Sequence, residues 1–113
     1  MIDSFSFGTM TIDGRSYTSD LMIFPDGSVR DSWWRTSGHV LAIGDISDLM
    51  DTTPNVLIAG TGVNGLMKPE RGLSRYLAER GVEFMAGPNE KTVRWFNQKS
   101  PAGGVAACFH LSC

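Results

Sequence analysis

The sequence predicts a single α/β domain in which an N-terminal β meander precedes a mixed sheet flanked by helices. Three observations lead to this class. The first 35 residues carry two turn signals between runs of strand-forming residues. The remaining residues alternate apolar strand patterns with helix patterns, as in sheets that helices cover. The chain of 113 residues, 42% hydrophobic and 19% charged, has the size and composition of one globular domain.

Two turns organise the predicted meander. Asp-Gly at positions 13–14 is a strong signal for a two-residue hairpin loop, whose register would pair Met10 with Tyr17. Pro-Asp-Gly at positions 25–27 predicts a second turn, because proline presets one corner and glycine accepts a positive φ at the next. We therefore expect β structure throughout residues 1–35.

Strands and helices alternate after Gly38. Residues 39–51 predict a short strand followed by one or two helical turns. The continuous apolar run at 55–60 is typical of a strand covered on both faces. Pro69 suits the first position of a helix and Gly81 suits its C-cap, which predicts a helix over 69–80. A strand over 82–87, a helix over 88–99 and a closing strand from 105 complete the prediction.

Inward-facing residues follow from the same periodicities. The first long helix directs Leu73, Tyr76 and Leu77 to the core, and the second directs Val93 and Phe96 there. The closing strand has two faces. One carries Val105, Ala107, Phe109 and Leu111, and the other carries Ala106, Cys108 and His110.

The stretch NVLIAGTGVNG at 55–65 contains the spacing Gly60-x-Gly62-x-x-Gly65 directly after a strand. In a dinucleotide site, such glycines let the backbone approach a pyrophosphate, and an acidic residue about 20 positions on binds the ribose. Glu83 stands 18 residues after Gly65. The helix signals begin only at Lys68 or Pro69, and the remaining chain is short for a full dinucleotide fold.

Two other interpretations of this loop stay open. The glycines could serve only a tight reversal at the end of a strand. Alternatively, this loop and the Ala-Gly-Pro at 86–88 could face one crevice with exposed amides, and Lys68 could add a positive charge there. The candidate ligand-binding residues are Gly60, Thr61, Gly62, Gly65, Lys68, Glu83 and Gly87.

The run DSWWR places Trp33 and Trp34 on opposite faces of an expected strand, so that one is core and the other partly exposed. An exposed tryptophan beside arginine has the composition of an interaction hot spot. Trp33, Trp34 and Arg35 are therefore the candidate interaction surface. The alternative is that a helix or loop covers the second tryptophan.

No catalytic constellation emerges, and we expect no metal and no cofactor. His39 and His110 have no ligand partners at metal-binding spacing, and His110 fits a hydrogen-bonded structural residue. Cys108 and Cys113 are five positions apart, which disfavours chelation or a bond between them. The sequence leaves open whether the chain is an enzyme, and the lack of a catalytic constellation favours a protein that is not one.

Charge and hydropathy limit the classes of partner that the chain is expected to bind. A net charge of −2 gives no case for nucleic acid as the main partner. No apolar run approaches the length of about 18 residues that a membrane span needs, and no secretory signal is evident. We expect a cytoplasmic protein that is not transmembrane, with a protein partner and, as the alternative, a small anionic ligand.

Residues 19–87 resemble the family catalogued as domain of unknown function 498, the Mth938-like domain. The matching marks are Pro-Asp-Gly at 25–27 with tryptophan after it, Gly-His at 38–39, Asp45 opening a short helix, the segment 54–62, and Gly-Val-Glu at 81–83. The family includes mitochondrial complex I assembly factor 3 and an adipogenesis-associated protein. The resemblance implies a three-layer domain around a mixed five-stranded sheet with one antiparallel strand.

The chain departs from this family near its C-terminal end. The family usually has a threonine where Gly87 stands, and an acidic-Gly-Arg-Arg turn where this chain has KSPAGG at 99–104. The resemblance implies no established dehydrogenase. It favours a non-enzymatic binding or assembly module of the respiratory-complex type. The alternative is a protein that binds a small anionic ligand or a nucleotide through residues 60–65.

Overall fold

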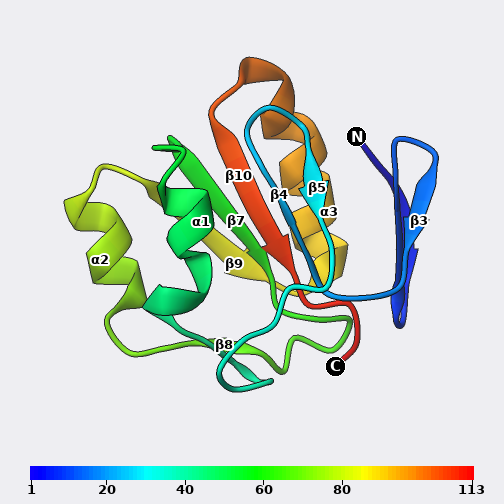
Figure 1. Cartoon of the computed structure of the whole chain (residues 1–113), viewed down its shortest axis with the longest axis horizontal. Helices are drawn as coiled ribbons and strands as arrows, with labels where there is room; N and C mark the ends of the chain where they lie inside the picture. Colours follow the sequence, from blue (N-terminus) through cyan, green and yellow to red (C-terminus); the bar gives the residue numbers. More distant parts are fainter.

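The computed structural model describes all residues, 1–113 (Figure 1). The strands are β1 (Ile2–Ser6), β2 (Thr9–Ile12), β3 (Arg15–Tyr17), β4 (Leu21–Ile23), β5 (Val29–Arg30), β6 (Val40–Leu41), β7 (Val56–Gly60), β8 (Lys68–Pro69), β9 (Glu83–Gly87) and β10 (Val105–Phe109). The α-helices are α1 (Ser47–Met50), α2 (Leu73–Glu79) and α3 (Asn89–Lys99). The 3₁₀ turns η1 (Ile43–Ile46) and η2 (Ser100–Ala102) precede α1 and follow α3. No helix has the length and apolar character needed to cross a bilayer.

The central sheet has five strands in the order β5-β4-β10-β7-β9. Strands β7, β9 and β10 are parallel, and β4 is antiparallel to both of its neighbours. The mixed α/β fold with one antiparallel strand is therefore confirmed. Because Gly60 pairs with both Phe109 and Gly87, the carboxyl ends of the three parallel strands meet at one edge of the sheet.

The N-terminal third is β-rich, but it does not form one meander. Strands β1, β2 and β3 form a separate sheet, and β4 and β5 join the central sheet instead. The first turn is as predicted: Met10 pairs with Tyr17, and Asp13 and Gly14 both have positive φ. Figure 1 shows the separate sheet on one side of the central sheet and α1 and α2 on the other.

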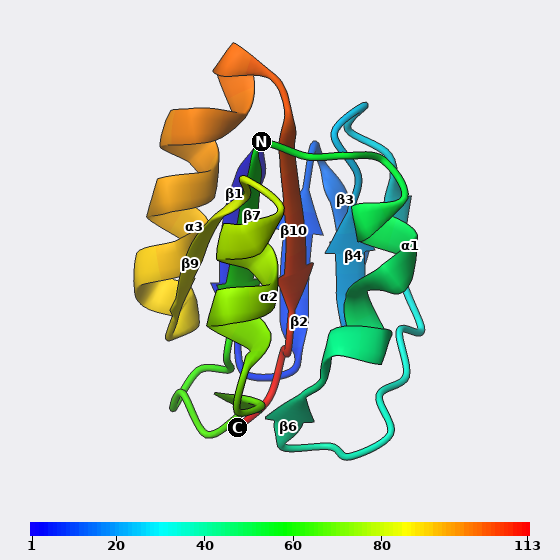
Figure 2. The same cartoon turned by 90° about the vertical axis from the view of Figure 1, so that its left-hand side faces the viewer.

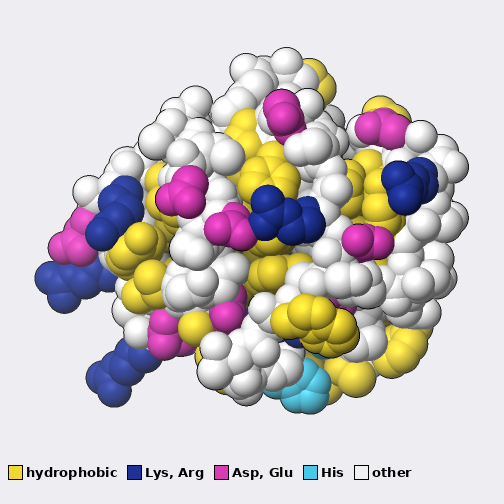
Figure 3. Space-filling view, viewed as in Figure 1, with side chains coloured by type: hydrophobic (Ala, Val, Ile, Leu, Met, Phe, Trp, Pro, Cys, Tyr) yellow, Lys and Arg dark blue, Asp and Glu magenta, His cyan; other side chains and the backbone are white.

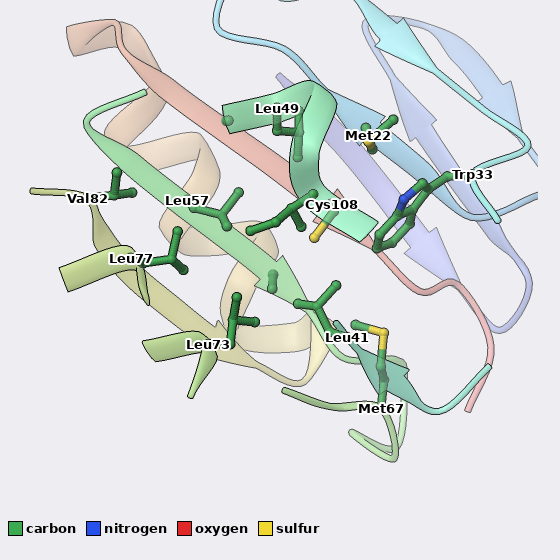
Figure 4. Close-up of a cluster of buried hydrophobic side chains, with 13 residues drawn as sticks. Met22, Trp33, Leu41, Leu49, Leu57, Met67, Leu73, Leu77, Val82 and Cys108 are labelled. Atoms are coloured by element: carbon green, nitrogen blue, oxygen red, sulfur yellow. The ribbon is translucent and has the colours of Figure 1, made fainter. Parts of the chain in front are cut away.

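Two hydrophobic clusters lie on the two faces of the central sheet. One joins α1 and α2 to the sheet through Leu49, Leu73 and Leu77, which pack with Leu57 and Cys108 (Figure 4). The other joins α3 and the three-stranded sheet to the opposite face. Its members are Ile2, Met10, Ile12, Leu21, Ile23, Ile58, Val93, Phe96, Val105, Ala107, Phe109 and Leu111. The molecule thus has three layers, and β10 divides its side chains between the clusters as its alternation predicts.

Two predicted elements differ from the structure. The helix expected over 69–80 begins only at Leu73, because Pro69 lies in β8, which pairs with β6. Figure 2 shows the course of the chain from β6 through α1 and on to α2. The expected strand around Trp33 and Trp34 is absent, since residues 31–35 form no ladder. Strand β6 lies within the short strand predicted at the start of residues 39–51, but β8 carries a helix-start signal, so local sequence could not reveal that the two pair.

Candidate functional site

Adjacent tryptophans have opposite environments in the segment that follows β5. Trp33 is 6% exposed and belongs to the cluster beneath α1, where its ring points toward Cys108 (Figure 4). Its Nε1 donates to the Asp45 carbonyl at 3.0 Å. Trp34 is 83% exposed. The expected division into one core and one exposed tryptophan is correct, although no strand produces it.

Hydrogen bonds hold the backbone on both sides of Trp34. The Trp33 N–H donates to the Asp20 carbonyl at 3.0 Å, and the Thr36 N–H reaches the Asp45 carboxylate at 3.3 Å. The Arg35 guanidinium donates to the Gly38 carbonyl at 2.8 Å and stacks 4.7 Å from the Trp33 ring centroid. An exposed indole is therefore presented on a constrained backbone.

The Arg35 side chain is buried, which the sequence did not predict. Only 4% of it is exposed, and its NH1 lies 2.8 Å from the Asp20 carboxylate. His110 Nδ1 lies 2.8 Å from the same Asp20 oxygen and 3.1 Å from Arg35 NH2. The Leu111 N–H donates to the other Asp20 oxygen at 2.8 Å. This Asp20–Arg35–His110 cluster joins the start of β4, the tryptophan segment and the end of β10.

The Asp20 pKa reflects two opposing effects. Burial alone would raise it, but the hydrogen bonds from His110, Leu111 and Arg35 outweigh burial and lower the pKa below its ordinary value of 3.8. Because the folded state favours the carboxylate, Asp20 contributes stability above pH 3.8, and this contribution is lost as the pH falls through the lower folded-state pKa.

We predict that an Asp20→Asn substitution costs less stability in acid than at neutral pH. Below the folded-state pKa, wild-type Asp20 is itself protonated and resembles the amide. Urea unfolding of both proteins from neutral pH down to about pH 2 measures the difference. A difference that stays constant over this range would contradict the assignment.

In the same cluster His110 lies between the Asp20 carboxylate and the Ser112 hydroxyl, yet the geometry is not that of an activated serine nucleophile. Ser112 Oγ lies 3.4 Å from His110 Nε2, which is long for a hydrogen bond. His110 Nδ1 is already engaged by the Asp20 carboxylate at 2.8 Å and lies 3.1 Å from Arg35 NH2, which holds the ring within the cluster. Burial raises the Cys108 pKa to about 12, so this thiol stays protonated. The described geometry therefore favours a structural network.

The glycines of residues 60–65 have packing reasons of their own. A Cβ on Gly60 would overlap the Phe109 ring and the Asn89 side-chain oxygen. Gly62 has a φ of +109° and lies against the backbone of Cys113. Gly65 also has a positive φ, at +69°. Close contacts at Gly60 and Gly62 and the positive φ of Gly65 thus account for the spacing that suggests a phosphate loop.

Most main-chain N–H groups of this loop already have acceptors. Gly62 N–H donates to the Asn89 side chain at 3.2 Å, and Val63 and Leu66 donate to the carbonyls of Ser112 and Cys113. Asn89 in turn donates to the His110 carbonyl at 2.8 Å. The Asn64 N–H is an exception, because no protein acceptor bonds to it. The loop is therefore not a cradle of converging free amides.

We predict that Gly60→Ala destabilises the fold by about 1–3 kcal/mol, because the added methyl group overpacks a filled site. Gly44→Ala is the matched control, since a Cβ there meets nothing within 4 Å. Chemical denaturation of the two variants tests this difference. Equal stability of both variants would show that Gly60 is not required by packing.

A pocket of about 400 Å³ lies beside the loop, at the carboxyl ends of β7 and β9. It is lined by Thr61, Asn64, Gly65, Met67, Lys68, Pro69, Ala86, Gly87 and Pro88. Four predicted ligand-binding residues therefore come together here, and β7 and β9 are neighbours, as the crevice interpretation requires. Gly60 and Gly62 face the interior instead.

Glu83 is not part of this pocket. It begins β9 and pairs with Val56 at the amino end of β7, whereas Gly87 ends β9 beside the pocket. Four residue steps along a strand separate the two by about 13 Å. The Glu83 carboxylate instead lies 3.6 Å from Lys99 Nζ. The pocket thus lacks the acidic residue that a dinucleotide site places near the ribose.

Comparison with protein families gives one match over almost the whole chain. The model described as "Protein of unknown function (DUF498/DUF598)" matches residues 2–110. Comparison with curated proteins finds no significant match.

Solved structures share the fold. A conserved hypothetical protein, PH1505 from Pyrococcus horikoshii OT3, superposes with a TM-score of 0.87 at 20% identity, covering 100% of this chain and 99% of that one. The protein MT938 has a TM-score of 0.80 at 27% identity, covering 100% and 98%. A Bordetella pertussis protein described as a Mth938-like domain has a TM-score of 0.63 at 15% identity, covering 98% and 85%.

Proposed function

We propose that this chain, which belongs to the DUF498/DUF598 family of proteins of unknown function, is a non-enzymatic binding module whose exposed Trp34 docks a protein partner. The observation that carries this proposal is the contrast between an indole that is 83% exposed and the hydrogen bonds that hold its neighbours. A large side chain on a constrained backbone loses little conformational entropy on binding.

The surroundings of Trp34 suit an apolar contact. Arg35 and His110 contact each other, so the tryptophan segment lies against the end of β10. The residues after β10 bond to Gly8 on one side and to Leu66 on the other. Phe7, the residue before Gly8, is 60% exposed, and Leu66 is 50% exposed. Figure 3 shows hydrophobic side chains and a histidine at the surface along the lower edge of the molecule.

The kind of partner follows from this surface and from the family. Interfaces between proteins are enriched in tryptophan at well-packed centres, which favours a protein surface with a pocket for the indole. The resemblance to a family that includes a mitochondrial complex I assembly factor supports assembly of a larger complex as the purpose of such docking.

A photo-crosslinking residue at the exposed position 36, which leaves Trp34 in place, tests this proposal. We expect a discrete crosslinked protein from cell extract that is absent when the same residue replaces Arg75, whose side chain is 86% exposed on α2. The same products from both positions would contradict a docking role for Trp34.

A second candidate function, binding of a small ligand, is favoured by the pocket that collects Thr61, Gly65, Lys68 and Gly87. Thermal unfolding against nucleotides, dinucleotides and simple phosphates tests it. A ligand at 100 times its Kd adds about 2.7 kcal/mol to the unfolding free energy. Stabilisation by none of these compounds would count against this second function.

A further inference from the structure

The pocket at the carboxyl ends of β7 and β9 has a distinct charge. Lys68 is its one charged lining residue, and neither aspartate nor glutamate lines it. The Lys68 ammonium donates to the Gly65 carbonyl at 3.1 Å, which uses one of its three donors and holds the group at the pocket. The protein as a whole carries a net charge of −2, so this pocket is a local exception.

Thr61 provides an independent indication of a ligand. The residue is only 5% exposed and lines the pocket, and its hydroxyl makes no hydrogen bond within the protein. The hydroxyl is not one of the fully enclosed side-chain atoms without a partner, so it reaches the pocket, and its donor and acceptor are free for a ligand. Thr61 Oγ1 also lies 3.6 Å from the position that a Cβ on Gly65 would occupy, so glycine keeps the space beside the hydroxyl open.

Further groups favour negative charge in the pocket. Asn64 lines it and has a main-chain N–H without a protein acceptor. Pro88, another lining residue, is the N-cap of α3, a helix of 11 residues. The N-terminus of such a helix carries partial positive charge.

We infer that this pocket binds a small molecule through an anionic group, a carboxylate or a phosphate, which accepts hydrogen bonds from Lys68 Nζ and Thr61 Oγ1. This inference rests on the second function above and specifies the chemistry of its ligand. The remaining lining residues Met67, Ala86 and the two prolines provide apolar contacts for the rest of the molecule.

Amide NMR spectra with acetate, inorganic phosphate and acetamide as probes test the inference. Acetate and acetamide match in size and differ in charge. We expect saturable shifts at residues 64–68 and 86–87 with acetate, phosphate or both, and none with acetamide. The more effective anion identifies the group as a carboxylate or a phosphate.

Substitutions assign the response to the pocket. Lys68→Met and Thr61→Val should each weaken anion binding at least about tenfold, since charge-assisted hydrogen bonds are strong. Lys91→Met, at an exposed lysine of α3 outside the lining, should not weaken it.

The possible failures are distinguishable. Equal binding of acetamide would overturn the anionic class and leave small-ligand binding in place. Shifts that are absent from these residues, or equal losses in the Lys91 variant, would overturn the site. If no compound in the thermal panel stabilises the protein either, the second function fails with it.

Discussion

Asp20→Asn is expected to destabilise the protein by about 3–5 kcal/mol at neutral pH, although it changes one atom of the side chain. The substitution removes the negative charge that faces the buried Arg35 guanidinium. Arginine cannot lose its proton to compensate, and its Nε already has no hydrogen-bond partner. Removing one member of a buried ion pair leaves an uncompensated charge, which is why the cost is large. Urea unfolding at neutral pH measures it.

The exposed Arg30–Asp48 pair is the matched control. Both of its side chains are 55% exposed, so Asp48→Asn should cost less than about 1 kcal/mol. Combining Asp20→Asn with Arg35→Met should recover part of the loss, because the double variant no longer buries a charge. Equal effects of the two aspartate substitutions would show that the buried cluster contributes no more than a surface pair.

Trp33→Ala is expected to destabilise the protein by about 3–5 kcal/mol, whereas Trp34→Ala should change its stability by less than about 0.5 kcal/mol. The first substitution leaves a large cavity beneath α1 and removes the hydrogen bond to Asp45. The second removes a ring that is mostly in water. Chemical denaturation of both variants, followed by circular dichroism, measures the difference between two identical side chains at adjacent positions.

The comparison also tests whether the tryptophan segment is ordered in solution. A destabilisation of more than about 2 kcal/mol by Trp34→Ala would mean that the indole packs against the protein and is not free for a partner. A negligible effect of Trp33→Ala would mean that the segment does not anchor to the core.

Local patterns were sufficient to predict the elements whose signals lie within a few residues. Strands β7, β9 and β10, helix α3, and the register of the first hairpin all follow from apolar runs, alternation and turn residues. The predicted helix start at Pro69 is wrong because a proline that suits the first position of a helix also suits a short edge strand. Its actual partner, β6, becomes apparent only when the chain has folded.

The sequence predicts one candidate site better than the other, because only one of them is assembled by neighbouring elements of the chain. Thr61, Gly65, Lys68 and Gly87 come together because β7 and β9 are parallel neighbours, which strand–helix–strand order suggests. The cluster of Asp20, Arg35 and His110 joins residues up to 90 positions apart. Neither their spacing nor a motif indicates that contact, and it determines that Arg35 is buried while Trp34 is exposed.

The affinity of a crosslinked partner for the Trp34→Ala variant tests the proposed docking role most directly. With the partner purified, calorimetry should show binding weakened by about 2 kcal/mol or more relative to wild type, about 30-fold in Kd. Arg75→Ala should bind as wild type does. Unchanged affinity of the Trp34→Ala variant, in a protein of unchanged stability, would contradict the proposal that this indole is the docking anchor.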